Sequence, residues 1–424
     1  MVYAGRVSRS FAEGSQMLEQ LAELEVSAKQ VERVTRRIGE ERVAERESEV
    51  AAYQALPLVE KFGVPAGASP PEVGVVMVDG GRIQILERGA QPSAAAQAQP
   101  LAGAKVAAES AADEAWEEAV EPAEKAGHWR EDKVGLLVTI ESAVSPSDPC
   151  PELPAAFGDV LRIPRLVREL KRNVKHTADA AAETDEPEAS ASALAEARRY
   201  EPPRVAKRQV LASRGSWRDF APVLAAAARA WGFQGAARRA FVGDGSANNW
   251  KLQRRCFGSF VPILDFIHAL SYVFAAAMAG RKFAAGWACY QSWIAWVWQG
   301  QVGRVIGALQ ERQAELGVPT KDEAETSPRK VVAQALSYLR NHQDKMRYDE
   351  YRRLGLPITS SLIESVVKQV NRRVKGTEKF WSEQGGEAIL QLRADHLSDD
   401  QPLAAFWQRR QATATGQRRY HRAS

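Results

Sequence analysis

Cysteine and long apolar runs are scarce in this chain. Its 424 residues include three cysteines, Cys150, Cys256 and Cys289, which lie far apart and form no Cys-x-x-Cys pair. An odd number of separated cysteines argues against both a disulfide framework and a zinc ribbon. No stretch reaches the roughly eighteen apolar residues of a transmembrane helix; residues 261–279 come closest but contain an aspartate and a histidine. Since the first residues also lack an apolar signal region, we expect a cytoplasmic protein without a membrane partner.

The net charge is small but unevenly distributed. The chain has 57 Lys and Arg against 53 Asp and Glu, a formal net charge of +4 at pH 7. From Lys345 to the C-terminus, however, 15 Lys and Arg stand against 9 Asp and Glu. A basic segment of this kind attracts phosphate backbones, although the same surplus also fits a solvated helical surface.

Residues 1–69 are predicted to be helical, with the outline of a helix-turn-helix. The chain breaks near Glu25, and Ser27 is a suitable N-cap for a second helix. The apolar residues at helical spacing are Phe11, Leu18, Leu21 and Leu24 in the first helix and Val31, Val34 and Ile38 in the second. The candidate DNA contacts on the other faces of the second helix are Lys29, Arg33 and Arg37. This helix could enter a major groove, but a helical hairpin that packs on the next domain produces the same pattern.

Short apolar strands alternate with helical segments between residues 70 and 265. The predicted strands are residues 73–78, 133–140, 238–243 and 260–264, with a helix at 216–232. Three of the strands end at an acidic residue: Asp79, Asp244 or Asp265. Residues 90–127 and 177–201 are rich in Ala and Glu, and we interpret both as exposed insertions of weak order. The alternation indicates an α/β sheet with its site at the strand ends.

Residues 266–355 have an almost wholly helical pattern and are rich in tryptophan. The tryptophans of this segment are Trp287, Trp293, Trp296 and Trp298. Large aromatic side chains dominate the buried area of helical domains, so we expect most of them in a core. Stacking on DNA is the alternative for a minority.

Three carboxylates combine into a candidate metal site. Asp79 and Asp244 each follow a predicted buried strand, and Glu364 lies one turn inside a helix predicted at residues 360–375. Two-metal phosphoryl transfer requires hard oxygen ligands, which hold a pair of ions about 3.5–4 Å apart. For either aspartate alone, an ordinary Asp-Gly turn is the commoner explanation. Only the combination favours a metal site.

Several sequence blocks resemble those of a known family. They are Val78-Asp79-Gly80, residues 129–131 (WRE), residues 133–135 (KVG), residues 242–250 (VGDGSANNW), residues 263–270 (ILDFIHAL), residues 358–365 (ITSSLIES), residues 373–376 (RVKG) and Phe380-Trp381. In this order, over residues 70–395, they resemble the bacterial insertion-sequence DDE transposases with an RNase H-like catalytic domain. The closest group is the Kra-type one, which is related to Mutator-like elements.

This resemblance implies both a fold and a catalytic site. The fold would be α/β, with an RNase H-like mixed sheet flanked by helices and interrupted by an all-helical insertion domain. Asp79, Asp244 and Glu364 would hold two Mg²⁺ or Mn²⁺ ions, and His268 of the block Asp265-x-x-His268 would lie near them. A lone histidine on a helix is more often structural. The implied partners are terminal inverted repeats and target DNA, bound by a homodimer in the active complex.

These observations together predict five segments. Residues 1–69 form the helical segment, 70–265 the first part of the catalytic domain, 266–355 the insertion, 356–395 the last part with Glu364, and 396–424 a basic tail. The predicted phosphate contacts are Lys368, Arg372, Arg373 and Lys375. Trp250 and Trp381 are candidates for stacking on an unpaired base, with core packing as the alternative for each.

The predicted activity is metal-dependent cleavage and strand transfer of an insertion sequence by a nucleoid-associated enzyme. Two alternatives stay open: a nuclease or resolvase on the same scaffold, and a DNA-binding remnant without catalysis. Related transposases usually begin further upstream with an additional DNA-binding region. This difference raises the hypothesis that the chain is N-terminally incomplete and inactive.

Overall fold

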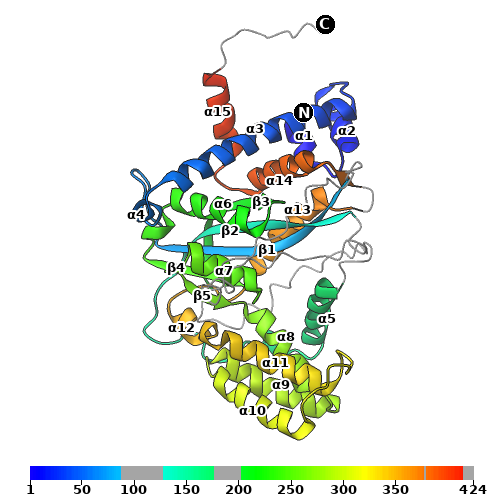
Figure 1. Ribbon diagram of the computed structural model, residues 1–424, viewed down its shortest axis with the longest axis vertical. Helices are drawn as coiled ribbons and strands as arrows, with labels where there is room; N and C mark the ends of the chain where they lie inside the picture. Colours follow the sequence, from blue (N-terminus) through cyan, green and yellow to red (C-terminus); the bar gives the residue numbers. More distant parts are fainter. Residues whose placement is uncertain (87–127, 176–201, 377–378, 414–424) are drawn as a thin grey trace, which may run out of the picture.

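A mixed β-sheet forms the centre of the molecule (Figure 1). The computed structural model describes residues 1–86, 128–175, 202–376 and 379–413, so the two predicted insertions at 90–127 and 177–201 lie outside the described residues. The strands are β1 (Val73–Ile85), β2 (Trp129–Glu141), β3 (Arg204–Ser213), β4 (Arg238–Gly243), β5 (Val261–Leu264) and the short β6 (Phe380–Trp381). Their order is β3-β2-β1-β4-β5, with β6 paired to the end of β1. The predicted α/β class, with a mixed sheet flanked by helices, is confirmed.

The sheet changes direction at β1. Strands β1, β2 and β3 pair antiparallel, whereas β4 pairs parallel to β1 and β5 pairs parallel to β4. The strands predicted at 238–243 and 260–264 agree with their observed bounds to within one residue. Strand β3 is not among the predicted strands, because its first half is polar and largely exposed and lacks the apolar run that marks a buried strand.

The predicted end of β1 at Asp79 is wrong. The strand continues for six more residues, and Asp79 pairs with Val134 in the middle of the β1–β2 ladder. The two glycines that follow do not turn the chain. Instead they make room for the acidic residues of β2: a Cβ on Gly81 would lie 2.7 Å from Oδ2 of Asp132.

Helices cover the two faces of the sheet. On one face, α6 (Trp217–Ala230) packs Phe220 and Leu224 against Gly135 of β2. The other face is covered by α13 (Ser361–Val374), which contacts β1 and β2. Successive residues of a strand point to opposite faces, so Val134, and with it its partner Asp79, faces α13. The predicted helices at 216–232 and 360–375 are therefore confirmed, and Glu364 lies on the same side of the sheet as Asp79.

The N-terminal helices pack along the β3 edge of the sheet together with the C-terminal ones. They are α1 (Val2–Val7), α2 (Phe11–Ala22), α3 (Ala28–Ala55) and the short α4 (Leu58–Lys61), and they are followed at the other end of the chain by α14 (Glu383–Leu397) and α15 (Pro402–Ala412). Ser27 caps α3 in a full capping box, as predicted. The predicted apolar stripe of the first helix is wrong at its end, because Leu21 and Leu24 are 76% and 50% exposed.

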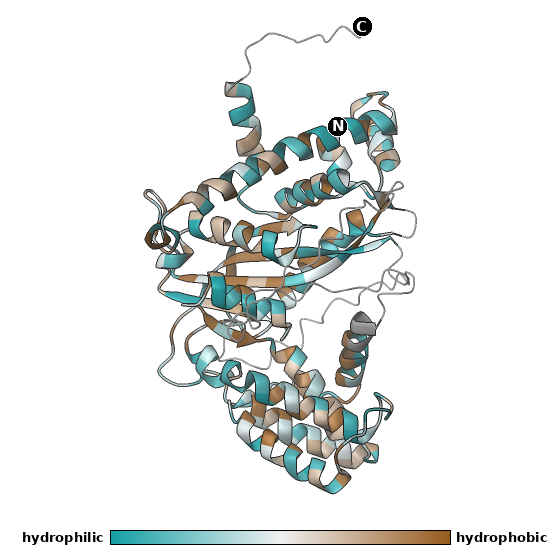
Figure 2. Ribbon diagram, in the orientation of Figure 1, coloured by the Kyte–Doolittle hydropathy of each residue, from teal (hydrophilic) through white to brown (hydrophobic). Residues whose placement is uncertain are grey.

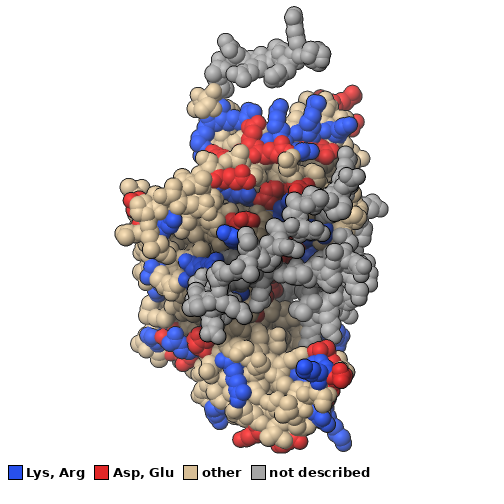
Figure 3. Space-filling model, in the orientation of Figure 1, with Lys and Arg blue, Asp and Glu red and all other residues tan. Residues whose placement is uncertain are grey.

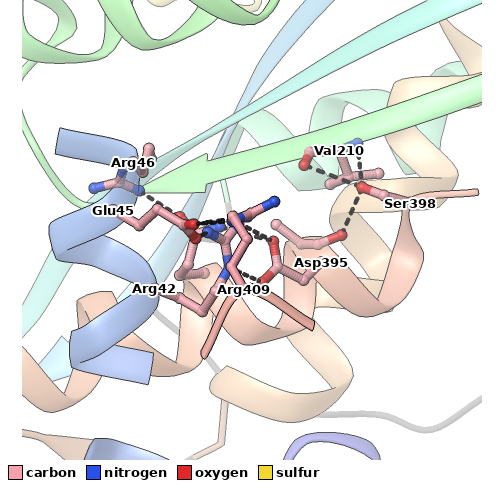
Figure 4. A network of polar contacts seen from close by, with 9 residues as sticks. Arg42, Glu45, Arg46, Val210, Asp395, Ser398 and Arg409 are labelled. Atoms are coloured by element: carbon pink, nitrogen blue, oxygen red, sulfur yellow. Dashed lines mark hydrogen bonds and ion pairs between the residues drawn. The ribbon is translucent and has the colours of Figure 1, made fainter. Parts of the chain in front are cut away.

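Buried ion pairs fasten α3 to α14 (Figure 4). The guanidinium of Arg42 donates to both carboxylate oxygens of Asp395. The side chain of Arg42 is only 7% exposed and that of Asp395 only 3%. One turn further along, Arg46 donates to Glu387 and to the main-chain carbonyl of Ala212 in β3. Helix α3 thus packs on α14 and on β3 of the sheet, which agrees with the predicted alternative of a packing hairpin. Its outer face stays exposed.

Five helices lie between β5 and α13 and pack mainly on one another. They are α8 (Phe266–Met278), α9 (Phe283–Trp298), α10 (Val302–Leu316), α11 (Pro328–His342) and α12 (Tyr348–Arg353). Trp293 and Trp298 are buried, whereas Trp287 and Trp296 are partly buried against the core. Hydrophobic residues mark the central strands and run through this helical group, while α3 is largely hydrophilic (Figure 2). In the described parts of the chain, no helix combines the length and apolar character needed to cross a membrane.

Two further helices complete the described structure. Helix α5 (Arg162–Lys175) contacts α8, and α7 (Ala247–Cys256) follows β4. Within residues 396–413 of the predicted basic tail, α15 buries Leu403 and Phe406. Its two arginines, Arg409 and Arg410, pair with Glu45 and Glu41 of α3. These basic residues are therefore partly neutralised within the chain.

Candidate functional site

Three aspartates lie side by side where β1, β4 and β5 meet. The parallel register places Met77 beside Val242 and Gly243 beside Leu264. Asp79 follows Met77 by two residues and Asp244 follows Val242 by two, so these aspartates are neighbours. Asp244 follows Gly243 directly and Asp265 follows Leu264 directly, so these two are neighbours as well. Neighbours in a parallel ladder point to the same face of a sheet, so this row of acids faces α13.

Glu364 completes the group from the first turn of α13. The helix begins where Ser360, its N-cap, donates its main-chain N–H to Oδ1 of Asp265 at 2.8 Å. Ser360 makes no side-chain cap hydrogen bond, so this main-chain contact with Asp265 is the one that ties the helix start to the site. Glu364 is half-buried and follows one turn later. Asp265 thereby determines where Glu364 stands relative to the strands.

The acidic residues act on one another electrostatically. Burial, the charge of Asp244 and that of Glu364 raise the pKa of Asp79 to about 7, although a hydrogen bond from the Gly80 N–H opposes this. The pKa of Glu364 is also raised, first by burial and then by the charges of Asp265 and Asp244. Such mutual repulsion requires proximity. The strand register and these couplings place the three predicted carboxylates on the same side of the sheet. Among the described residues, the group whose ligand atoms lie within 4.8 Å of one another is Asp265, His268 and Glu364.

Asp244 is oriented by its own turn and by the helical group. Its Oδ1 accepts hydrogen bonds from the main-chain N–H of Ser246 at 2.9 Å and from Nδ2 of Asn249 at 2.8 Å. Its main-chain carbonyl accepts a hydrogen bond of 2.7 Å from the hydroxyl of Tyr338 in α11. The next residue, Gly245, has φ +99°, a conformation that glycine adopts without strain. The predicted Asp-Gly turn after this strand is therefore present, and it carries the carboxylate.

His268 forms a close pair with Asp265. Oδ2 of Asp265 accepts the main-chain N–H of His268 at 3.0 Å and lies 2.6 Å from its Nδ1. Burial alone would lower the pKa of His268. The hydrogen bond to Asp265, together with the charges of Asp265, Asp244 and Glu364, raises it to about 9. His268 is thus a cation at neutral pH, placed beside the carboxylates.

Asp265 is the site residue that the sequence analysis left out of the metal set. Ligand atoms of Asp265, His268 and Glu364 lie within 4.8 Å of one another and could hold a metal ion. However, Oδ2 of Asp265 has two contacts with His268 and Oδ1 accepts the main-chain N–H of Ser360, and a protonated His268 has no lone pair to offer. We interpret Asp265 as the residue that orients His268 and α13. Two features of the sequence point to a role for Asp265: it follows a strand, and a histidine stands three residues later.

The predicted DNA contacts fall into three groups. Exposed residues are Lys29, Arg33 and Arg37 on α3 and Lys368, Arg372 and Lys375 on or just after α13. Trp381 is half-buried, and its Nε1 donates to the carbonyl of Val374. Trp250 and Arg373 are only 4% and 2% exposed. The predicted surface roles of these last two are therefore wrong.

The buried positions have simple physical causes. The ring of Trp250 packs beside Phe241 of β4 and beside His342 of α11. Arg373 lies on the same side of α13 as Val370 and Val366, three and seven residues earlier, and its Nε donates to the carbonyl of Gly5 at 2.9 Å. Helical spacing already places Arg373 on the buried stripe.

The site therefore unites residues from β1, β4, the start of α8 and α13. It gathers Asp79, Asp244, His268 and Glu364, and α13 extends from it with exposed basic residues. No protein-family model matches this chain, and no curated protein matches it either.

Proposed function

We propose that this chain is a DNA transposase that cuts and joins DNA on an RNase H-like scaffold. The observation that carries the proposal is the gathering of Asp79, Asp244 and Glu364 from two adjacent strands and a helix. The sheet order supports the scaffold: three antiparallel strands followed by two parallel ones, with the site at the centre of the parallel part. Helices α8–α12 then form the insertion between β5 and the helix that carries Glu364.

The donor set fits Mg²⁺ or Mn²⁺. These ions prefer carboxylate oxygens. The site offers three carboxylates, and burial together with the charges of neighbouring carboxylates raises the pKa of Asp79 and of Glu364. A cation would relieve the repulsion between these charges. When bound, a pair of such ions activates the attacking oxygen and stabilises the leaving one.

The residues around the triad orient it and neutralise charge. Asn249 and the Asp244 turn direct the carboxylate of Asp244, and Asp265 directs both His268 and α13. The positive charge of His268 lies beside the carboxylates and would stabilise negative charge that develops on a phosphate bound there. Lys368, Arg372 and Lys375 are exposed on or just after α13 and would contact the DNA backbone on either side of that phosphate.

The reaction has two phosphoryl-transfer steps. Water first attacks a phosphodiester at the element end, the P–O bond to the neighbouring sugar breaks, and a free 3′-hydroxyl results. That hydroxyl then attacks a phosphodiester of target DNA, forming one P–O bond as another breaks. The number of phosphodiester bonds is conserved in the second step, so no nucleotide cofactor is required.

One assay tests the proposal against its two alternatives. The protein is incubated with Mg²⁺ or Mn²⁺, labelled duplex carrying the terminal repeats that flank its gene, and supercoiled target plasmid. We expect 3′-end cleavage and covalent strand-transfer products, both absent for Asp244→Asn. Cleavage without joining identifies a nuclease or resolvase. DNA binding without cleavage by the wild-type chain identifies a catalytically inactive remnant.

A further inference from the structure

A cluster of basic residues lies where the C-terminal end of α13 meets α1, α2 and α14. We call it the junction cluster, and its members are Arg6, Arg9, Arg372, Arg373, Lys379 and Arg393. They come from segments far apart in the sequence that the fold brings together. Lys and Arg side chains also gather along the edge of the molecule formed by α1–α3 (Figure 3).

The buried members of the junction cluster donate to main-chain carbonyls rather than to carboxylates. Arg373 donates to the carbonyls of Gly5 and Arg9, at 2.9 and 3.5 Å. Arg393 donates to the carbonyls of Gln369 and Arg6, at 3.1–3.2 Å and 3.4 Å. In the described residues, every hydrogen bond from these two guanidiniums ends on such a carbonyl. Carbonyl dipoles orient the guanidiniums but leave their net charge in place.

Two donors of the junction cluster have no partner among the described residues. They are Nη2 of Arg373, whose side chain is 2% exposed, and Nε of the half-buried Arg6. The guanidinium of Arg373 lies 4.5 Å from the ring centre of Phe11 and 5.1 Å from that of Trp381, so it is held in place. An unpaired buried donor on a charged group is costly. An oxyanion bound beside Arg6 and Arg373 would bring a compensating negative charge close to both guanidiniums.

The electrostatics of the neighbourhood favour the binding of an anion. Burial and the charge of Arg393 lower the pKa of Arg373 to about 10, against the opposing charge of Glu13. Burial and the charges of Arg6 and Arg393 lower the pKa of His396 to about 4. The guanidinium of Arg373 also packs on the first residue of α2, so the positive end of that helix dipole lies beside it.

We propose that the junction cluster binds a phosphate of a nucleic-acid backbone. Arg6 and Arg372 contact the phosphate, and the buried charge of Arg373 attracts it. Arginine suits this task because its planar fork matches phosphate oxygens. Helix α13 carries both Glu364 and Arg373, nine residues apart, or about 13 Å at the helical rise per residue. The bound phosphate would therefore lie about 13 Å along α13 from the one that is cut. That the bound anion belongs to a nucleic acid rests on the proposed function; that the cluster binds an anion does not.

Duplex binding in EDTA tests the site without any cleavage. The affinity of the full chain for a random duplex is measured across a NaCl series for wild type, Arg6→Gln, the double variant Arg6→Gln/Arg372→Gln, and Lys321→Gln as an exposed control outside the cluster. We expect the slope of log K against log salt to become shallower by about 0.9 for each phosphate that the variant no longer neutralises, with no change for the control. Arg6→Lys, which keeps the charge, should retain most of the slope. Slopes equal to wild type in both Gln variants overturn the proposal.

Thermal unfolding with inorganic phosphate or pyrophosphate separates the two sources of the anion. Both anions should raise the Tm of the wild-type chain more than that of the double variant, at matched ionic strength. Stabilisation by free phosphate with an unchanged DNA salt slope overturns the nucleic-acid assignment, since the site would then serve a small anion. Neither outcome depends on the metal site, so a chain that fails to cleave DNA can still confirm or refute the junction cluster.

Discussion

Tyr338 donates a hydrogen bond of 2.7 Å to the main-chain carbonyl of Asp244, and this contact joins the helical group to the acidic site. Tyr338 belongs to α11, ninety-four residues further along the chain, and its ring stacks on that of Tyr272 at 3.8 Å between centres. A Cβ on Gly245 would lie 2.7 Å from the same hydroxyl. Helix α11 of the α8–α12 group therefore stabilises the turn at Asp244.

Replacing Tyr338 by Phe should impair the site more than the fold. Losing one hydroxyl–carbonyl hydrogen bond costs about 1 kcal/mol, and the loosened turn should raise the Mn²⁺ concentration needed for half-maximal DNA cleavage. The matched control is Tyr351→Phe, which removes a similar bond to Pro262 in β5. Both variants should lose similar stability in urea unfolding. An equal shift in metal dependence for both would refute a specific role for Tyr338.

Removing the charge of Asp244 should abolish metal binding while the fold persists. Wild type at 100 times the Kd of Mn²⁺ should gain about 2.7 kcal/mol of stability, and EDTA should reverse the gain. Asp244→Asn keeps the size of the side chain and should show no such gain. Asp344→Asn, a change at an exposed carboxylate in the helical group, should respond like wild type. If Asp244→Asn still responded to Mn²⁺, the assignment of this aspartate as a ligand would be wrong.

Asp132 should make the protein more stable at low pH than at high pH. Its side chain is fully buried, neither of its oxygens has a partner in another described residue, and burial raises its pKa to about 7. A hydrogen bond from its own main chain and the charges of Lys133 and Lys375 lower that pKa and the charge of Glu131 raises it, but burial outweighs the lowering effects. Because the folded-state pKa lies above the unfolded one, the stability linked to this proton is complete below about pH 4 and is lost as pH rises through 7.

The corresponding measurement compares Asp132→Asn with wild type by urea unfolding from pH 5 to pH 8. Asparagine carries no charge, so the variant should be the more stable protein at pH 8, by at most about 4 kcal/mol, and the difference should shrink toward pH 5. Asp322→Asn, at an exposed position, serves as the control. A difference that does not vary with pH would show that Asp132 is already neutral or well solvated.

Breaking the Arg42–Asp395 ion pair should weaken the packing of α3 on α14 and lower the stability of the protein. Removing one partner of a buried ion pair leaves the other charge uncompensated and costs about 3–5 kcal/mol, so Asp395→Ala should lower the urea midpoint strongly. Arg410→Ala breaks the more exposed pair with Glu41 on the same helix and should change stability little. Equal effects of the two substitutions would contradict the role of the buried network in Figure 4.

Local sequence patterns determined most of the secondary structure and the identity of the acidic residues. The apolar runs at 238–243 and 260–264, the capping box at Ser27 and the stripe of α13 depend on neighbours within a few residues, which the sequence displays directly. The same local signals singled out Asp79, Asp244 and Glu364. Their interpretation as metal ligands stays a prediction.

Tertiary structure alone decided what these residues contact. Asp79 lies in mid-strand because β2 pairs along the whole of β1, and Asp265 matters because its oxygens meet His268 and Ser360, the latter ninety-five residues away. The carbonyl that the buried Arg373 meets belongs to Gly5, because α1 packs over the end of α13. Such contacts join segments that are distant in sequence, so no pattern within one helix or strand contains them. The sequence determined which groups could do chemistry, and the packing of distant segments decided which of them meet, because burial and mutual charge exist only once the chain has folded.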